Sequence, residues 1–423
     1  MRIAVIGAGI VGITSAYELA ADGHEVTVFE RRGAAAEETS FANAGIVAPG
    51  YVTPWAAPGM PGKVLRHLLS RHAPVRLSLP LSGSELAWIW KWYQSCIPET
   101  YLANRARMQR LAFYSRARLH QLSVELELDY DCSPGYLVLL RSEKDSRMIQ
   151  PSLQVLRETG VAFGELSEEE ARAIEPALNP DTRFVGAVHL PDDGVANCRQ
   201  FALLLKGRAQ RIGAKFEFNK TVAQLDRARP ASIYIADEDQ PRDFDRLVIC
   251  AGLASAQLLR PLGLNIPLAA VYGYSISAPI GEPLNAPRSA LMDERYKVAI
   301  TRLGNRVRVA GSAEIGGSLQ ARRASSIQTL YKVLRDWFPG AARHSNLLGA
   351  SVQEWKGARP MLPDGPPIIG ESGLPGLWLN LGHGSSGWAL SCGSARALAD
   401  MMAGKPAGID MEGLGIGRLD RLA

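Results

Sequence analysis

A glycine-rich motif near the N-terminus constrains the fold of this chain more than any other feature. Residues 3–6 form a short apolar run with β-branched side chains, which is typical of a buried parallel strand. The segment Gly7–Gly12 has the spacing GxGxxG, and a helical apolar pattern follows it directly. A second strand pattern over 26–29 ends at Glu30, about 20 residues on, where an acidic side chain accepts ribose hydroxyls. This context predicts a dinucleotide-binding βαβ unit.

Each glycine of the motif has a physical task in such a unit. Gly7 makes the tight turn, Gly9 lets the backbone approach a pyrophosphate, and Gly12 lets the helix pack closely on the strand. The helix N-terminus at Ile10 and Val11 offers N–H groups and the positive end of its dipole to the phosphates. The motif by itself does not distinguish NAD from FAD.

Composition excludes several classes of protein. With 423 residues the chain is long enough for two domains or one elaborate domain. The net charge of +5, from 47 basic and 42 acidic residues, is too small and diffuse for a dedicated nucleic-acid binder. No apolar run reaches the ~18 residues of a membrane-spanning helix. The five scattered cysteines contain no CxxC pair, which argues against a disulfide framework and a metal site and favours a cytoplasmic setting.

The order of the expected elements predicts a discontinuous cofactor domain. Nucleotide-type strands and helices occur at the beginning, middle and end of the chain, and a helical region over 83–122 and antiparallel strands lie between them. We therefore expect an α/β (α+β) fold with a Rossmann-like domain and a substrate domain built on a mainly antiparallel sheet. The expected cofactor domain comprises residues 1–55, 190–260 and 345–423, and the expected substrate domain comprises residues 56–189 and 261–344.

Further motifs carry a resemblance to a known family. They are Thr39–Gly45, Pro49–Gly59, Gly273–Ser275, Arg302 with Arg306–Val309, Gly357–Gly365 and Gly382–Trp388. Together with the N-terminal motif they resemble the small subunits of D-amino-acid dehydrogenases, a branch of the FAD-dependent D-amino-acid oxidase and glycine oxidase superfamily. The resemblance covers nearly the whole chain.

The resemblance implies an activity. It implies oxidative deamination of D-amino acids to 2-oxo acids and ammonia, with hydride transfer from Cα to flavin N5. Electrons then pass to a quinone or another component of the respiratory chain. Related amine dehydrogenases or oxidases for glycine, sarcosine or D-hydroxyproline are the nearest alternative. An NAD-dependent dehydrogenase and a flavin-binding subunit without catalysis are alternatives from other classes.

The resemblance also implies a set of FAD contacts beyond the first motif and Glu30. A helix that begins after the turn at 382–387 aims its dipole at the negative charge that a reduced flavin gains. No cysteine lies between Val333 and Ser391, where covalent-flavin members of the superfamily use one, so we expect FAD to be noncovalent. The further expected contacts are Arg31, Arg32, Thr39, Ser40, Asn43, Ala44, Gly45, Thr221, Val222, Ala251, Gly252, Gly382, His383, Gly384, Ser385, Ser386, Gly387 and Trp388.

Substrate recognition requires a cation for the carboxylate. Arg359 lies where the family places that arginine, and a planar guanidinium grips a carboxylate with two hydrogen bonds. Ser385 stands where glycine oxidases have a second arginine. Tyr272, Tyr296 and Tyr51 are candidate phenol donors to the substrate. We expect no catalytic side chain, since a neutral amine releases a hydride without a base.

An aromatic run is the last feature with functional potential. Trp88, Trp90, Trp92 and Tyr93 lie within the expected helical region. They are expected either to pack in the core or to form a peripheral contact with the inner face of the cell membrane or an electron acceptor. The sequence leaves both interpretations open.

Overall fold

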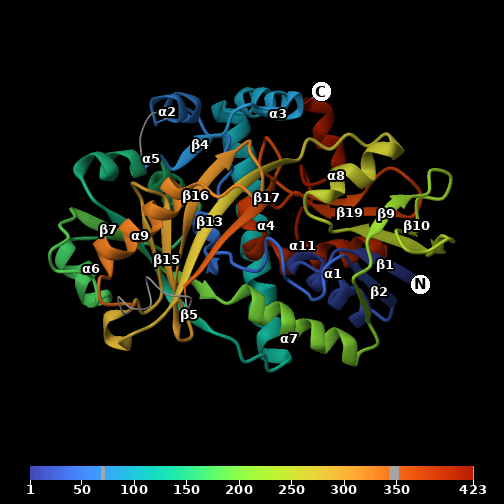
Figure 1. Ribbon diagram of the computed structural model, residues 1–423, viewed down its shortest axis with the longest axis horizontal. Helices are drawn as coiled ribbons and strands as arrows, with labels where there is room; N and C mark the ends of the chain where they lie inside the picture. The colour runs from blue at the N-terminus through green and yellow to red at the C-terminus, as the bar shows by residue number, and fades with distance from the viewer. Residues whose placement is uncertain (68–71, 343–351, 423) are drawn as a thin grey trace.

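The computed structural model describes residues 1–67, 72–342 and 352–422. Its strands form two large sheets that lie side by side, and the long helix α4 (Pro98–Glu125) runs between them (Figure 1). One sheet is nearly all parallel and the other is mainly antiparallel. The predicted mixed α/β class is therefore confirmed.

The first sheet has six strands with β1 near its centre. All neighbouring strands are parallel except β18, which pairs antiparallel with β19. This is the sheet that the N-terminal motif predicts, because short apolar strands covered on both faces pair in parallel. In order across the sheet the strands are β18 (Ile368–Glu371), β19 (Leu377–Leu381), β12 (Arg246–Ile249), β1 (Arg2–Ile6), β2 (Glu25–Glu30) and β8 (Lys215–Phe218).

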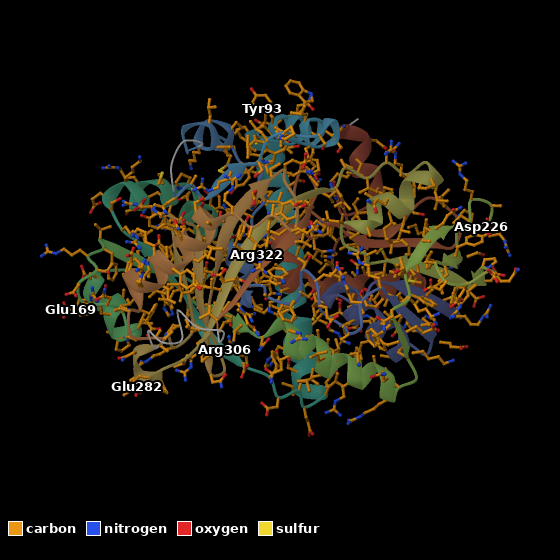
Figure 2. The ribbon with its side chains drawn as sticks, viewed as in Figure 1. Tyr93, Glu169, Asp226, Glu282, Arg306 and Arg322 are labelled. Carbon is orange, nitrogen blue, oxygen red and sulfur yellow. The ribbon has the colours of Figure 1, made fainter. Side chains whose placement is uncertain are left out.

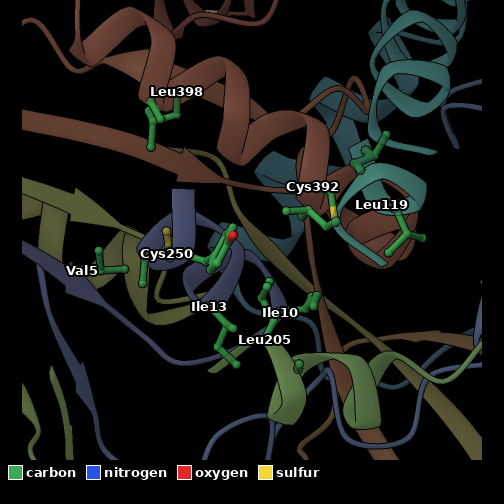
Figure 3. Close-up of a cluster of buried hydrophobic side chains, with 14 of the residues drawn as sticks. Val5, Ile10, Ile13, Leu119, Leu205, Cys250, Cys392 and Leu398 are labelled. Atoms are coloured by element: carbon green, nitrogen blue, oxygen red, sulfur yellow. The ribbon is translucent and has the colours of Figure 1, made fainter. Parts of the chain in front are cut away.

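Helices from distant parts of the chain cover one face of this sheet. Figure 3 shows Ile13 of α1 (Ile10–Ala21) near Leu205 of α7 (Cys198–Arg211), with Cys392 of α11 (Gly387–Met402) facing Leu119 of α4. These side chains are almost entirely buried. The opposite face is covered by β9 (Val222–Leu225), β10 (Ser232–Ile235), β11 (Arg242–Asp243), α8 (Ala254–Leu259) and η2 (Arg260–Leu262).

The second sheet has ten strands and is mainly antiparallel. Its main path runs β17 (Gln353–Met361), β13 (Ala269–Pro279), β16 (Arg306–Ile315), β15 (Val298–Leu303), β14 (Ala290–Asp293), β5 (Cys132–Leu140), β7 (Gly186–Ala196) and β3 (Ile46–Val47). Two short strands pair with this path, β4 (Val75–Leu77) with β16 and β6 (Gly164–Leu166) with β7.

Two layers of helix cover the second sheet. On one face α9 (Ala324–Trp337) and α6 (Glu168–Ile174) pack on alternate side chains of the strands. On the other face lie α5 (Glu143–Glu158), α2 (Met60–His67) and α3 (Gly83–Gln94). Short helical turns complete the chain at η1 (Pro49–Tyr51), η3 (Pro283–Asn285), η4 (Gly384–Ser386) and η5 (Ile416–Leu422).

The structure differs from the sequence expectations at three places. The helical region expected over 83–122 is two helices, because α3 ends at Gln94 and Pro98 begins α4 at a position that needs no N–H donor. α4 lies in the expected substrate domain by sequence, but its apolar side chains pack into the core of the six-stranded sheet. β17 extends the ten-stranded sheet, although the expected boundary put residues 345–423 in the cofactor domain.

A buried ion-pair cluster holds three helices of the first core together. Glu18 of α1 is fully buried and accepts hydrogen bonds from Arg118 of α4 at 2.7 and 2.9 Å and from Arg396 of α11 at 2.8 Å. Without Glu18, Arg118 would keep only the more distant Glu125, at 3.9 Å, and removing one partner of a buried ion pair is strongly destabilising.

We predict that Glu18→Ala lowers the free energy of unfolding by about 3 kcal/mol, because both guanidinium groups lose this carboxylate and Arg396 keeps only Asp22 and Asp400. Chemical denaturation followed by tryptophan fluorescence measures the change. The control is Glu25→Ala, which removes an exposed pair with Lys215 and should cost less than about 1 kcal/mol. Equal effects of the two substitutions would contradict the role of the cluster.

Candidate functional site

A cavity of about 360 Å³ lies at the carboxyl ends of the parallel strands. Its wall contains the last residues of β1, β2, β12 and β19 and the N-terminus of α1. Open α/β sheets bind their ligands in this position. The cavity is therefore the place where the βαβ unit would hold a dinucleotide.

Close backbone contacts require two of the three glycines of the first motif, Gly7 and Gly12, whereas a Cβ on Gly9 would lie 3.5 Å from Ser40 Oγ, an ordinary contact. Gly7 has a φ of +102°, and a Cβ there would lie 2.7 Å from the carbonyl oxygen of Cys250. A Cβ on Gly12 would overlap the carbonyl oxygen of Gly7. Ile10 N–H donates to Ser40 Oγ at 3.0 Å, which fixes the segment around Ser40 against the start of α1. The turn thus brings bare backbone to the cavity wall, as a pyrophosphate requires.

Glu30 and the two arginines after it form a polar edge of this cavity. The Glu30 carboxylate accepts hydrogen bonds from the N–H groups of Ala8 at 2.8 Å and Arg32 at 2.9 Å. A carboxylate has about four acceptor positions, so Glu30 retains capacity for a ribose diol. Arg31 and Arg32 both pair with Glu38 at 2.7 Å and are about half exposed. Arg31 lines the cavity, and Arg32 does not.

The other expected contacts in the N-terminal half and middle of the chain divide into two groups. Six of them line the first cavity, and three do not. Thr39 Oγ1 donates to the carbonyl oxygen of Ala358 at 2.7 Å, and the carbonyl oxygen of Asn43 accepts from Arg308 at 3.0 Å. The lining residues are Thr39, Ser40, Thr221, Val222, Ala251 and Gly252, and the residues that do not line the cavity are Asn43, Ala44 and Gly45.

The C-terminal turn forms the other end of the cavity. Gly382, His383, Gly384 and Gly387 line it, and α11 begins at Gly387 without a side-chain cap. The His383 ring turns away and hydrogen bonds with Ser394 Oγ at 3.0 Å. Burial lowers the pKa of His383 to about 3, so its ring is neutral at physiological pH.

Three remaining residues of this segment have other surroundings. Ser385 and Ser386 line a second cavity and not the first. Trp388 is buried, and its indole N–H donates to the carbonyl oxygen of Ala196 at 2.9 Å. The turn at 382–387 therefore has one side on each cavity.

These residues fit FAD. The cavity extends from the α1 N-terminus, which suits a pyrophosphate, to the backbone turn at the start of α11, which suits an isoalloxazine ring. Asn380 also lines the cavity, and its buried Oδ1 has no hydrogen-bond partner among the described residues. An acceptor left unpaired at such a wall is consistent with a ligand that supplies the donor.

The second cavity, of about 690 Å³, meets the first at this turn. Arg359 of β17 lines it, with its Nη1 donating to the carbonyl oxygen of Ser312 at 3.1 Å. Burial lowers the pKa of Arg359 to about 10, so the guanidinium stays charged at neutral pH. Of the residues that the structure describes, none offers Arg359 a carboxylate. The site therefore presents an uncompensated cation to its ligand.

Gly273 provides the space that Arg359 occupies. The Arg359 side chain crosses from β17 over Gly273 of β13, and a Cβ on Gly273 would lie 2.7 Å from Nη1 and closer still to Cζ. A β-bulge on β16 places Ser312 and Ala313 opposite Gly273. Ser312 adopts a φ of +57°, which is strained for a residue with a side chain and is common where a bulge redirects a group at a functional site. Its carbonyl is the one that Arg359 contacts.

The three expected tyrosines lie in different surroundings. Tyr51 lines the second cavity; its hydroxyl donates to Glu294 at 2.5 Å, and its ring packs edge-on against Tyr136. Tyr272 does not line that cavity, and its ring packs against Lys356. Tyr296 does not line it either, and its ring contacts Arg141.

Sequence reasoning missed several residues of the two cavities. Gly273 stood within a motif but had no assigned task, because its task depends on which strand pairs beside it. Ser312 gave no signal, since nothing in its residue type marks a positive φ. Arg105, a buried arginine in the wall of the second cavity, is hidden in the pattern of a long polar helix.

Comparisons with known proteins agree with this geometry. The family model for FAD dependent oxidoreductases matches residues 2–401. A D-amino acid dehydrogenase from Bradyrhizobium diazoefficiens is 42% identical over 99% of both chains. One from Cereibacter sphaeroides is 42% identical over 99% of this chain and 95% of its own. The crystal structure of glycine oxidase from Geobacillus kaustophilus is similar in fold, with a TM-score of 0.76, 21% identity and 98% of each chain covered.

We predict that Gly273→Ala weakens the binding of a small carboxylate such as benzoate by roughly tenfold or more, because the new Cβ displaces Arg359. FAD content should not change, since Gly273 does not line the first cavity. Perturbation of flavin absorbance on titration measures the affinity. The control is Gly207→Ala on α7, where a Cβ meets nothing within 4 Å. Unaltered benzoate affinity in Gly273→Ala would show that Arg359 is not held by this contact.

Proposed function

The chain belongs to the FAD-dependent oxidoreductase family, and we propose that it oxidises D-amino acids to 2-oxo acids and ammonia. The family and the cofactor, both predicted from the sequence motifs, are confirmed by the match over residues 2–401. The proposed substrate class is supported by relatives that are 42% identical and bear the name D-amino acid dehydrogenase. Glycine oxidase is similar in fold only.

The observation that carries this proposal is the charge of Arg359 where the two cavities meet. We propose that its guanidinium binds the substrate carboxylate through two hydrogen bonds and so fixes the direction of the Cα–H bond. FAD, when bound in the first cavity, supplies the hydride acceptor. The N-terminus of α11 lies where it stabilises negative charge on that acceptor.

The proposed reaction needs no protein base. His383 is the nearest titratable group on the turn, but it is neutral, buried and hydrogen-bonded to Ser394. The amine reacts as the neutral species, and the apolar wall of the second cavity excludes water from it. The Tyr51 hydroxyl is engaged by Glu294, so we propose that Tyr51 shapes the cavity wall beside the substrate.

The second cavity favours a substrate with a side chain over glycine or sarcosine. Its volume of about 690 Å³ far exceeds what an amino acid without a side chain fills. Apolar residues form much of its wall, namely Met148, Ile149, Leu153, Leu156, Val188, Leu190 and Met292. An unfilled apolar cavity contributes no contacts to binding, so larger D-amino acids gain more from this site.

We predict that D-amino acids bleach the flavin absorption of the purified holoenzyme under anaerobic conditions and that L-enantiomers do not. Arg359→Ala should raise the D-amino-acid concentration that gives half-maximal bleaching by roughly 100-fold while FAD stays bound, because the carboxylate contact is lost. Stopped-flow spectroscopy with D-alanine, L-alanine, glycine, sarcosine and D-hydroxyproline measures the rates. Faster bleaching by glycine or sarcosine than by D-alanine would overturn the D-amino-acid assignment. If Arg359→Ala needs the same substrate concentration as the wild type, Arg359 does not bind the substrate carboxylate.

We also propose that the electrons pass to a membrane quinone or another respiratory carrier through peripheral contact at α3. Leu86, Trp90 and Tyr93 of α3 and Ile97 after it are 49–60% exposed and recur at helical spacing. The Trp90 and Tyr93 rings stack on each other, and Figure 2 shows Tyr93 projecting from the surface. Trp88 and Trp92, by contrast, are buried. Among the described residues no helix is long and apolar enough to cross a bilayer.

We predict that the double substitution Trp90→Glu and Tyr93→Glu reduces binding to vesicles of phosphatidylethanolamine and phosphatidylglycerol by about tenfold, because two amphipathic rings are lost from the contact. Activity with a soluble dye acceptor should not change. Co-sedimentation measures binding, and Leu284→Glu, at an 84% exposed position on η3, is the control. If the double variant sediments with vesicles as the wild type does, α3 is not the membrane contact.

A further inference from the structure

Arg105 is a buried cation that faces the second cavity without a counter-charge. It is 2% exposed and lines the cavity from α4. Its Nη1 donates to the Tyr101 hydroxyl at 3.3 Å and its Nη2 to the carbonyl oxygen of Ser152 at 3.4 Å. Its Nε has no hydrogen-bond partner among the described residues, nor does any described carboxylate pair with it. Both contacts are long, since charged donors reach their acceptors at about 2.7–2.9 Å.

Such an arrangement is costly unless a ligand completes it. Burying a guanidinium without a paired anion loses its hydration and returns little Coulomb energy. Two other mostly buried arginines avoid the cost, Arg418 with Asp364 at 2.6 Å and Arg141 with Asp293 at 2.7 Å. The open donor of Arg105 therefore indicates an anion that enters the cavity.

The position of Arg105 suits one end of a ligand whose other end lies on Arg359. The Arg359 guanidinium reaches Ser312 on β16, whereas Arg105 contacts Ser152 of α5, which packs over β5 and β7. The sheet order β16-β15-β14-β5 places three strand spacings between the elements that hold them. Both guanidinium groups nevertheless line the same cavity, Arg359 from β17 and Arg105 from α4. A ligand with two anionic groups therefore finds one cation for each of them in this cavity.

The cavity wall also has the charge and polarity for such a ligand. Its two acidic residues are already neutralised, because Asp145 pairs with Arg295 at 3.1 Å and Glu294 pairs with Lys297. Lys63 and Lys144 add positive charge at exposed positions of the lining. The apolar wall described above provides the contact surface for methylene groups. The charged groups of the lining therefore favour anionic over cationic side chains.

We propose that Arg105 is a specificity-determining residue that binds the side-chain carboxylate of an acidic D-amino acid. Arg359 holds the α-carboxylate of the same molecule. The proposal rests on the proposed function for the identity of the substrate, but the anion site on Arg105 exists independently of the reaction. It assigns this chain to acidic substrates within the class of D-amino acids.

The test compares charged and neutral ligands of matched shape on the holoenzyme. Anaerobic flavin reduction is measured with D-glutamate, D-glutamine and D-alanine, and binding of glutarate and butyrate is measured by perturbation of flavin absorbance. The variants are Arg105→Met, which removes the charge, and Arg105→Lys, which keeps it. The control is Arg110→Met on the same helix, whose side chain pairs with Asp410 and does not line the cavity.

We expect the wild type to use D-glutamate at least tenfold more efficiently than D-glutamine and to bind glutarate more tightly than butyrate by a similar factor. Arg105→Met should remove both preferences, because the efficiency with D-glutamate and the affinity for glutarate fall by roughly tenfold or more. The efficiency with D-glutamine and the affinity for butyrate should stay within about threefold of the wild type. Arg105→Lys should retain part of both preferences, and Arg110→Met should retain them fully. FAD content and the thermal unfolding midpoint of each variant establish that it is folded.

Three outcomes would overturn the proposal. The first is a wild type that shows no preference for D-glutamate and glutarate, and the second is an equal loss for acidic and neutral ligands in Arg105→Met. The third is a loss of preference in Arg110→Met as large as that in Arg105→Met. If Arg105→Met does not fold, the proposal is tested by the preference of the wild type for acidic ligands and by how much of it Arg105→Lys retains. If no D-amino acid reduces the flavin but glutarate still binds through Arg105, the anion site stands and the proposed function fails.

Discussion

The position of the Arg359 guanidinium depends on the absence of a side chain at one residue of the neighbouring strand. Its side chain crosses β13 at Gly273, where any Cβ would collide with the guanidinium, and ends on a carbonyl that the β16 bulge turns toward it. The cation is thus fixed by backbone geometry and not by an acidic partner. An arginine neutralised by a carboxylate of the chain would have less to offer a substrate. The register of three strands therefore determines the electrostatics of the site.

The same dependence on backbone geometry holds for the cofactor cavity. Its two ends come from opposite ends of the chain, the turn at Gly7–Gly12 and the turn at 382–387, and they meet because β1 and β19 flank β12. The cluster of Glu18 with Arg118 and Arg396 ties α1, α4 and α11 together behind them. Since both turns lie at the N-termini of α1 and α11, the helix core that aligns these helices also aligns the dipoles that face the cavity.

Local signals in the sequence were sufficient wherever a residue's task depends on its immediate neighbours. Most of the Gly7–Gly12 turn, Glu30 and the glycines of the 382–387 turn line the first cavity. Tasks that depend on strand pairing were not accessible, because no local pattern states that β17 lies beside β13 or that Gly273 lies under Arg359. The aromatic run shows the same limit: helical spacing divides Trp88 and Trp92 from Trp90, but only packing decides which face is buried. Tyr272 and Tyr296 were expected to donate hydrogen bonds to the substrate because they are tyrosines. Their rings pack against Lys356 and Arg141 outside the second cavity, and no local pattern in the sequence indicates this packing.

Charge compensation differs between four arginines packed among the helices and strands and two arginines that line the second cavity. Arg118, Arg396, Arg141 and Arg418 each pair with a carboxylate of the chain, and their side chains are mostly buried between packed elements. Arg359 and Arg105 are also largely enclosed, but neither has such a partner among the described residues, and both line the same cavity. Because an uncompensated buried charge destabilises a fold, its retention at two places in one cavity is explained most directly by a ligand with two anionic ends. In this proposal Arg359 binds the α-carboxylate, and Arg105, in the wall of the same cavity, binds the anionic group of the side chain.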